Sequence, residues 1–364
     1  MKIIPILLSL GLLSASGAVA QNTQKLTASK ANEYGLVYSL PRTAVDITVV
    51  TETMVLTPGE FANYARLHLG LDDAVRVPET KVSVKEVIIS TRGVPDADNR
   101  WMAQFKSGTP VSMLLNAAGI PLAVNAEEAE DAGQPALPQA VPMSQSPLQT
   151  DAARQALTLE MTRSTSLSKK AELAAQRIFE MREQRNELIS GNADNMPQDG
   201  GSLKIALDAL NAQEAALTAM FAGTVQTGTQ VNTFSVIPAD GEIADSVVAR
   251  ISPLDGVTST DDLRGIPLTM SLSVLQRGQL PVTEKGEAKK FPKGGVAYTI
   301  PGTARITVSY NGREVATATV ELAQLGETFG LDPGLFSNKK SPMQARFSPV
   351  TGAITELEPM NGSL

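Results

Sequence analysis

The sequence predicts an α+β protein, predominantly antiparallel β, in which two β-rich domains are joined by a central helical hairpin. Short runs of alternating apolar and polar residues, separated by Gly, Pro, Asn and Asp, occur in both halves of the chain and indicate strands. Only the stretch Ser166–Gly223 carries a long helical period. The predicted divisions are a signal peptide at 1–20, a disordered N-terminus at 21–33, an N-terminal β domain at 34–124, a Pro-rich and acidic linker at 125–150, a strand plus the helical hairpin at 151–223, and a C-terminal β domain at 224–364.

The central hairpin is predicted from apolar residues that recur at helical steps. In Lys169–Ser190 these residues form one stripe, charged residues fill most of the other positions, and no Pro or Gly interrupts them. Gly191 suits a helix C-cap, and a loop rich in Gly, Asn, Asp and Pro follows it. A second one-sided helix begins after Ser202 as N-cap and stops at Gly223. We expect the two stripes to pack together or on a sheet, so that the hairpin joins two β regions; the alternative is a stripe reserved for an outside partner.

The first twenty residues have the features of a signal peptide. Lys2 gives a positive start, Ile3–Leu13 is apolar, and Ala18-Val19-Ala20 ends the segment with a small-residue cleavage site. The apolar run is too short to span a membrane, and no Cys follows that could carry a lipid anchor. We therefore expect cleavage after Ala20 and export to a bacterial periplasm, with no membrane span in the mature protein.

The amino-acid composition argues against several classes of function for this protein. The 364 residues include no cysteine, which excludes disulfides, thiolate zinc sites and cysteine nucleophiles. A formal net charge of −7 without a basic cluster argues against a nucleic-acid partner. The low aromatic content, with one Trp, argues against a carbohydrate-binding module.

The N-terminal region is predicted to contain several strands and one short helix. Apolar residues alternate in Val45–Val49, which indicates a strand. Phe61–Leu69 follows capping residues and is predicted to be a short helix that Gly70 ends. The apolar phase shifts across Lys85 and Glu86, which indicates a β-bulge there.

Two predictions concern the middle of the chain. Asn125–Pro147 is rich in Pro, Ala, Gln and acidic residues and is predicted to be a linker or a long exposed loop. A strand is predicted around Ala156–Met161, before the helical hairpin.

The clearest β-hairpin joins Ala304–Tyr310 to Glu314–Leu322. A two-residue Asn-Gly loop would place Val308 opposite Val315 and would mix apolar and polar residues on each face. A three-residue loop, Asn311-Gly312-Arg313 with its glycine in a left-handed conformation, keeps one face apolar, so we predict that register. The predicted pairs are Val308 with Ala316, Ile306 with Ala318, and Ala304 with Val320.

One motif raises an enzymatic interpretation. Ser166-x-x-Lys169 begins a helix, Ala193-Asp194-Asn195 follows, and Lys293-Gly294-Gly295 precedes a strand. The order imitates the S-x-x-K, S-D-N and K-T-G elements of penicillin-recognising serine enzymes, in which the Ser attacks and the Lys assists proton transfer. The second element lacks its Ser and the third lacks its Thr. We favour Ser166 as a helix cap, and the alternative is an exported serine hydrolase with Ser166 as nucleophile and Lys169 as base.

The other titratable groups are predicted to be structural. His68 is the only histidine, so it cannot pair with a second His on a metal, and no Ser or Asp partner for a catalytic base is evident. Acids at helical spacing lie among arginines and indicate a solvated face, and acids in turns lack the spacing of a calcium loop. We therefore predict no catalytic, cofactor-binding or metal-binding residue. The helical acids are Glu180, Glu183 and Glu187, and the turn acids are Asp72, Asp73, Asp96, Asp98, Asp261 and Asp262.

Several segments resemble one family. The quoted runs are Ala171–Ile178, Met181–Arg185, Gly191–Gly200 and Leu210–Thr218 in the hairpin, with Tyr38–Asp46, Phe61–Asp72, Tyr298–Arg305 and Phe347–Ile354 outside it. They resemble the uncharacterised family of exported bacterial proteins called domain of unknown function 4831, over most of the mature chain. The resemblance implies export, and it implies no catalytic residue, cofactor or substrate.

These observations together predict a non-enzymatic cell-envelope protein that binds or scaffolds a protein or polymer partner. No nucleic acid and no cofactor are expected, and the sequence indicates no particular oligomeric state.

Overall fold

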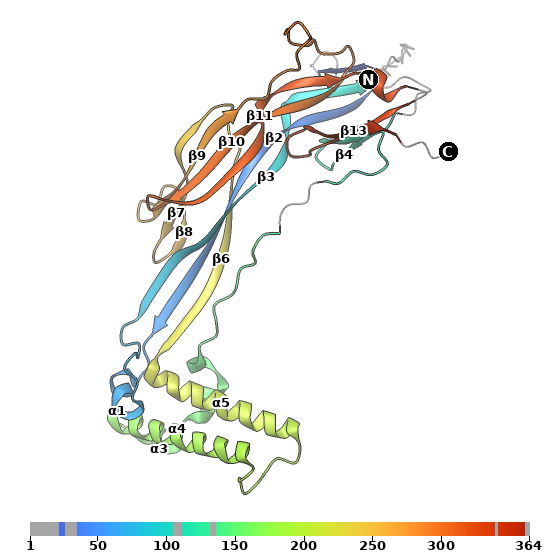
Figure 1. The fold of residues 1–364 in the computed structure, drawn as a ribbon. Coiled ribbons are helices and arrows are strands. Elements are labelled where there is room, and N and C mark those ends of the chain that lie inside the picture. The colour runs from blue at the N-terminus through green and yellow to red at the C-terminus, as the bar shows by residue number, and fades with distance from the viewer. Residues whose placement is uncertain (1–21, 26–34, 105–110, 132–135, 339–340, 361–364) are drawn as a thin grey trace, which may run out of the picture.

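The computed structural model describes residues 22–25, 35–104, 111–131, 136–338 and 341–360. Within them the protein has three antiparallel sheets and a group of helices, so the predicted α+β, β-rich class is confirmed. The sheets gather at one end of an elongated molecule and the long helices lie at the other (Figure 1). The predicted signal peptide at 1–20 lies outside the described residues.

The first sheet has the strand order β1-β3-β2-β6. Its strands are β1 (Asn22–Lys25), β2 (Leu36–Thr57), β3 (Glu79–Gln104) and β6 (Thr224–Val236). β2 and β3 form a hairpin of 22 and 26 residues, and at about 3.3 Å per residue each strand is roughly 70–85 Å long. The predicted bulge is confirmed, because Val50 pairs with Glu86 and Thr51 with Val84, which leaves Lys85 unpaired.

The second sheet has the order β11-β10-β9-β7-β8 and packs on the first. Its strands are β7 (Ile243–Ser252), β8 (Gly256–Thr258), β9 (Ile266–Gln276), β10 (Val296–Tyr310) and β11 (Arg313–Leu331). One face of β2, with Val45, Ile47 and Val49, meets inward side chains of this sheet such as Leu268 and Ile306, and all five are fully buried. Alternation in both sheets therefore builds one shared apolar core.

The third sheet, in the order β13-β12-β5-β4, closes the same end of the molecule. Its strands are β4 (Met113–Leu115), β5 (Pro121–Val124), β12 (Met343–Phe347) and β13 (Ile354–Pro359), and β4 and β5 form a hairpin. Asn125 is buried after β5, and its Nδ2 donates to the carbonyl oxygens of Phe336 and Met343, each at 3.0 Å. The short helix α6 (Pro333–Phe336) is thereby held beside the sheet.

Strands from distant parts of the chain pair directly. β2 pairs with β6, and β5 pairs with β12, so strands from the ranges 34–124 and 224–364 are hydrogen-bonded to each other and share a core. Whether the predicted domain boundaries separate units that fold independently stays a prediction. We call the three sheets around this shared core the head, and residues 52–57, 79–85 and 224–230 of the long strands the stalk.

The helices form a separate group, called here the foot, beyond the ends of β2, β3 and β6 (Figure 1). They are η2 (Ala62–Tyr64), α1 (Ala65–Leu69), η3 (Pro147–Gln149), α2 (Asp151–Ala156), α3 (Leu159–Arg163), α4 (Leu167–Ser190) and α5 (Gly200–Ala222). The long helices α4 and α5 occur where helical period predicts them, and Gly70 and Gly191 end α1 and α4 with left-handed φ angles of 68° and 75°.

The strand predicted around Ala156–Met161 is wrong, because two short helices occupy this stretch. The side chains of Thr150 and Thr158 accept from the backbone N–H groups of Ala153 and Met161, and so cap α2 and α3. Ala156 and Met161 are buried in the core of the foot, so helical packing overrides the local strand pattern.

The foot joins the stalk through close backbone contacts. The N–H of Phe61 donates to the carbonyl of Met220 at 2.7 Å, and the N–H of Val75 donates to that of Ala222 at 2.8 Å. Gly59 lies so close to Met220 that a Cβ there would overlap the Met220 carbonyl oxygen. The segment that connects β2 to β3 is thus fastened to the C-terminal end of α5.

The predicted register of the β10–β11 hairpin is confirmed, but the predicted loop is wrong. Val308 pairs with Ala316, while Tyr310 pairs with Arg313 across a two-residue turn. Asn311 and Gly312 both have positive φ, at 51° and 71°, as a type I′ turn requires. A bulge after Val308 then leaves one extra residue on β11 and restores the all-apolar face.

Two segments expected to lack structure are partly ordered. Asn22–Lys25 pairs with Gln104–Trp101, so the disorder predicted for 21–33 does not hold there, and residues 21 and 26–33 lie outside the described chain. Residues 136–146, called here the strap, have no regular structure but run along the edge of β6. The N–H of Thr229 donates to Val141 at 2.8 Å, and that of Ser144 donates to Thr227 at 3.1 Å.

Candidate functional site

The Ser-Lys pair lies at the exposed N-terminus of α4, and its two members have separate partners. Ser166 Oγ accepts from the backbone N–H of Lys169 at 3.4 Å, which is the capping geometry. Lys169 Nζ donates to Glu172 at 2.8 Å. This hydrogen bond lowers the pKa of the Glu172 carboxyl. Because the Ser166 hydroxyl is engaged by a backbone N–H and the Lys169 ammonium by Glu172, the observed contacts suit a helix cap.

His68 lies on α1, between aromatic rings. Its ring centroid is 6.2 Å from that of Tyr64 and 6.4 Å from that of Phe221. Its Nε2 is buried and has no hydrogen-bond partner among the described residues. Its ring neighbours belong to η2 and α5, so the histidine is part of the packing of the foot.

Three of the acids predicted to be structural have local basic or backbone partners. Asp72 pairs with Arg66 at 3.1 Å, Glu180 pairs with Arg177 at 3.2 Å, and Asp96 accepts from a backbone N–H two residues on. Within the described residues, no three His, Cys, Asp or Glu side chains lie together so that they could hold a metal ion.

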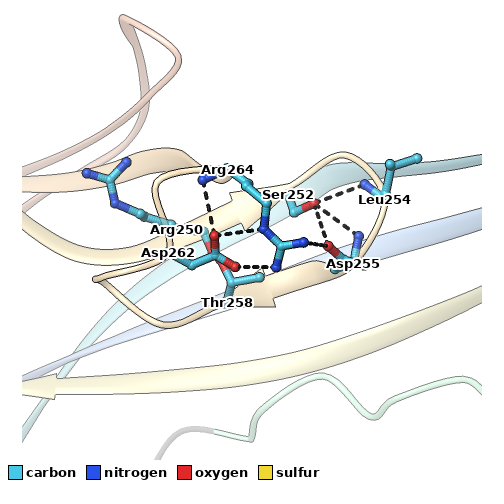
Figure 2. A network of polar contacts seen from close by, with 7 residues as sticks. All are labelled: Arg250, Ser252, Leu254, Asp255, Thr258, Asp262 and Arg264. Carbon is cyan, nitrogen blue, oxygen red and sulfur yellow. Dashed lines mark hydrogen bonds and ion pairs between the residues drawn. The ribbon is translucent and has the colours of Figure 1, made fainter.

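Asp262 belongs to a larger polar network at the turns beside β7 and β8 (Figure 2). Arg264 contacts it with two nitrogens, at 3.0 and 2.8 Å, and these hydrogen bonds lower the pKa of the Asp262 carboxyl. Arg250 donates to the backbone carbonyls of Thr260 and Gly265, while Ser252 Oγ accepts from two N–H groups of the next turn. These hydrogen bonds hold the backbone of the turns on either side of β8, so the network orders two exposed loops.

A cavity of about 290 Å³ lies on the outer face of the first sheet, beside the strap. Asp46, on the face of β2 opposite the core, accepts from Arg92 Nε at 2.8 Å and contacts Ser235 Oγ. Arg92 also donates to Ser235 at 3.2 Å. These groups satisfy one another across three strands and Leu137 of the strap borders them, so the cluster fastens strands and strap.

The foot contains a long helix with few charged residues. α5 carries only three charged residues, Lys204, Asp208 and Glu214, and a helix that is apolar on most sides is normally buried. Its buried residues are confined to Ala216–Phe221, and Ile205 near its N-terminus is 72% exposed. The sequence contained this signal, since the charge count of the helix can be read without a structure.

The two long helices meet in two different ways along their length. Toward the stalk, Ile178 and Met181 of α4 pack with Leu217 and Phe221 of α5. Farther out, Glu214 lies between Arg182, at 2.6 Å, and Arg185. Residues 182–215 are all described and none of them is buried, so the fully buried core ends where these ion pairs begin.

The outer half therefore has an uncovered apolar surface. Leu188, Leu203, Leu207 and Leu210 are only half-buried, and Ile189 is 67% exposed. Ile189 follows Ile178 by eleven residues, about three helical turns, so it continues the buried stripe of α4 beyond its cover. We call residues 186–212 the outer foot and treat its surface as the candidate functional site.

Fold and surface together define the class: a β-rich α+β protein whose β head carries a helical foot on long strands. The chain belongs to the family described as domain of unknown function 4831, whose model matches residues 34–355. No curated protein and no solved structure matches it. None of the described helices is long and apolar enough to cross a membrane.

Proposed function

We propose that this is an exported, non-enzymatic cell-envelope protein that binds or scaffolds a protein partner through its outer foot. One observation carries the proposal: α5 has few charges on any side, and its N-terminal half is exposed at the far end of the molecule. Exposed apolar surface of this kind marks association sites in soluble proteins.

The stalk supports this function by holding the foot away from the head. A partner can then approach the outer foot without contacting the sheets (Figure 1). The features of residues 1–20 support export, and a periplasmic location after cleavage at Ala20 is part of the proposal.

Site-specific crosslinking in living cells tests the proposal. A photo-crosslinking amino acid in place of Ile205 should yield a discrete crosslinked band, because that side chain would be covered by the partner. The matched control places the same amino acid at Leu263, which is 80% exposed in the head, and should yield no such band. Equal patterns at both positions, or no band at Ile205, would contradict binding through the outer foot.

The hydrolase alternative has its own readout. The proposal expects no stoichiometric reaction of the purified protein with a fluorophosphonate or a β-lactam. Labelling that is lost in Ser166→Ala would establish the enzyme instead.

A further inference from the structure

We propose that the head contains a second binding site, a cleft for a small zwitterion that carries an ammonium group and a carboxylate, as a free amino acid does. The cleft has a volume of about 320 Å³ and is lined by residues of β2, β3, β10 and β11, so it lies where the first and second sheets meet. It is separate from the outer foot, and the inference therefore goes beyond the proposed function and does not depend on it.

The cleft forms where both sheets interrupt their strand pairing. On β3, the four residues Asp96–Asn99 lie opposite the single residue Leu40 of β2. On β11, the four residues Ala323–Gly326 lie opposite the single residue Pro301 of β10. Both bulges contribute to the lining of the cleft, and bulges are frequent beside binding sites because they redirect side chains. The flanking pairs are Ser39 with Arg100 and Pro41 with Pro95 in the first sheet, and Ile300 with Glu327 and Gly302 with Leu322 in the second.

Hydrogen bonds fix the amide side chains of both bulges. The N–H of Thr43 donates to Gln324 Oε1 at 3.0 Å, and Gln324 Nε2 donates to the carbonyl of Thr43 at 2.9 Å. Asn99 Nδ2 donates to Thr328 Oγ1 at 3.4 Å, while Trp101 Nε1 donates to Asn99 Oδ1 at 2.8 Å. Because Thr43 is fully buried, this wall of the cleft is ordered before a ligand arrives, which lowers the entropic cost of binding.

Charged side chains of both signs line the same cleft. They belong to Arg42 of β2, to Asp96 of the β3 bulge and to Asp240, which follows β6. None of the three takes part in an ion pair within the described chain. Arg42 Nη2 donates to the carbonyl of Pro238 at 3.3 Å, and Asp96 Oδ1 accepts from the N–H of Asp98 at 3.0 Å. The remaining guanidinium nitrogens and the other carboxylate oxygen are left for a ligand.

The lining selects the chemical class of the ligand. A guanidinium binds a carboxylate, and carboxylates bind an ammonium, so an amino acid matches both kinds of charge. A neutral sugar would leave these charges without counterparts. The apolar side chains of the lining are small, at Pro41, Ala239 and Ala323, whereas Thr299 and Thr328 carry hydroxyls, so a large apolar ligand is not favoured. The volume is at the low end of ligand pockets, which suits a molecule of this size.

The first experiment measures binding to the purified protein. Trp101 is the only tryptophan and donates to Asn99 in the cleft wall, so its fluorescence should respond to a bound molecule. Each of the twenty protein amino acids is added singly, with glucose as the neutral comparison. At least one amino acid should give a saturable change with a Kd below about 1 mM, and glucose should give none.

The second experiment tests the need for both charges of the ligand. For the amino acid that binds most tightly, the analogue without the carboxylate and the analogue without the ammonium should each bind at least about tenfold more weakly. For L-glutamine these analogues are 4-aminobutanamide and glutaramate.

The third experiment locates the site. Asp96→Asn keeps an acceptor for the N–H of Asp98 but removes the charge, and it should weaken amino-acid binding at least about fivefold. Arg42→Gln should weaken binding to a similar degree because the carboxylate loses its counter-charge. The matched control is Asp98→Asn, which lies in the same bulge but does not line the cleft, and it should leave the Kd unchanged. Circular dichroism checks that the variants are folded.

Three results would overturn the inference: no saturable binding of any amino acid, an analogue with one charge that binds as tightly as the amino acid, or binding that neither Asp96→Asn nor Arg42→Gln weakens. Saturable binding of glucose alone would count as the first of these. Crosslinking from Ile205 does not involve the cleft, so its outcome tests the proposed function separately.

Discussion

The head and the foot bury apolar surface in opposite ways. In the head, two sheets face each other, and aliphatic side chains such as Ile47, Leu268 and Ile306 are sealed from solvent. The core of the foot combines five alanines with larger side chains such as Ile178, Met181 and Phe221, and its buried part stops halfway along the two long helices. The difference teaches that apolar burial in the head supplies most of the stability of the fold, while the foot keeps part of its apolar surface exposed and available for association.

The largest effect is expected from the core of the head. Ile306→Ala should lower the free energy of unfolding by about 3 kcal/mol, because a fully buried side chain leaves a cavity between two sheets. Ile205→Ala in the outer foot should change it by no more than about 0.5 kcal/mol in the monomer. Urea unfolding followed by fluorescence of Trp101, the single tryptophan, measures both. Similar losses would erase the contrast between the two regions.

The joint between foot and stalk comes next. Gly59→Ala should cost about 2 kcal/mol, since its Cβ meets backbone that cannot move aside. We expect the helical signal of the foot to be lost at lower urea than the Trp101 signal. Coincident transitions would show that head and foot unfold as one unit.

A smaller loss of stability is expected from removing a single buried hydroxyl in the head. Tyr38 is buried, and its Oη accepts from the N–H of Ala297 at 2.9 Å. Tyr38→Phe should cost about 1–2 kcal/mol by leaving that N–H without a partner.

The same residue predicts a dependence on pH. Burial raises the pKa of Tyr38 in the folded protein, whereas in the unfolded chain it ionises near its ordinary value of about 10. The folded state then holds more protons, so stability should fall as pH rises above about 10. In Tyr38→Phe this part of the alkaline loss should disappear, and an unchanged pH profile would contradict the assignment.

The smallest effect is expected at the cap of α4. Ser166→Ala should cost about 0.5–1 kcal/mol, because it removes an exposed N-cap acceptor. Ser166→Asp keeps an acceptor and should restore most of the loss. The thermal transition of the helical signal measures both variants, and a failure of Asp to restore stability would argue against capping.

Sequence patterns were sufficient where the signal is local. The requirement that one face of the hairpin stays apolar selects the right residue pairs between β10 and β11, because a strand with one buried side tolerates one register. It does not reveal that a two-residue turn and a bulge produce that register, since a three-residue loop satisfies the same rule. The phase shift at Lys85 predicts its bulge for the same local reason.

Long-range pairing has no such local signal. β2 and β6 are more than a hundred residues apart, and the residue pattern of neither strand determines which strand it pairs with. The lateral position of the strap is set by hydrogen bonds to Thr227 and Thr229 and by Gly228, whose missing side chain leaves room for Met143. For the candidate site, the low charge of α5 is readable in advance, but its exposure depends on how far α2 and η3 reach.

The stalk also determines how the molecule responds to tension. The backbone passes between head and foot four times, in β2, β3, the strap and β6. A force that pulls the foot away from the head is therefore shared by four covalently continuous segments of the backbone, and no hydrogen bond of the stalk has to resist it. Extension would begin inside the head or the foot, while the stalk keeps its length.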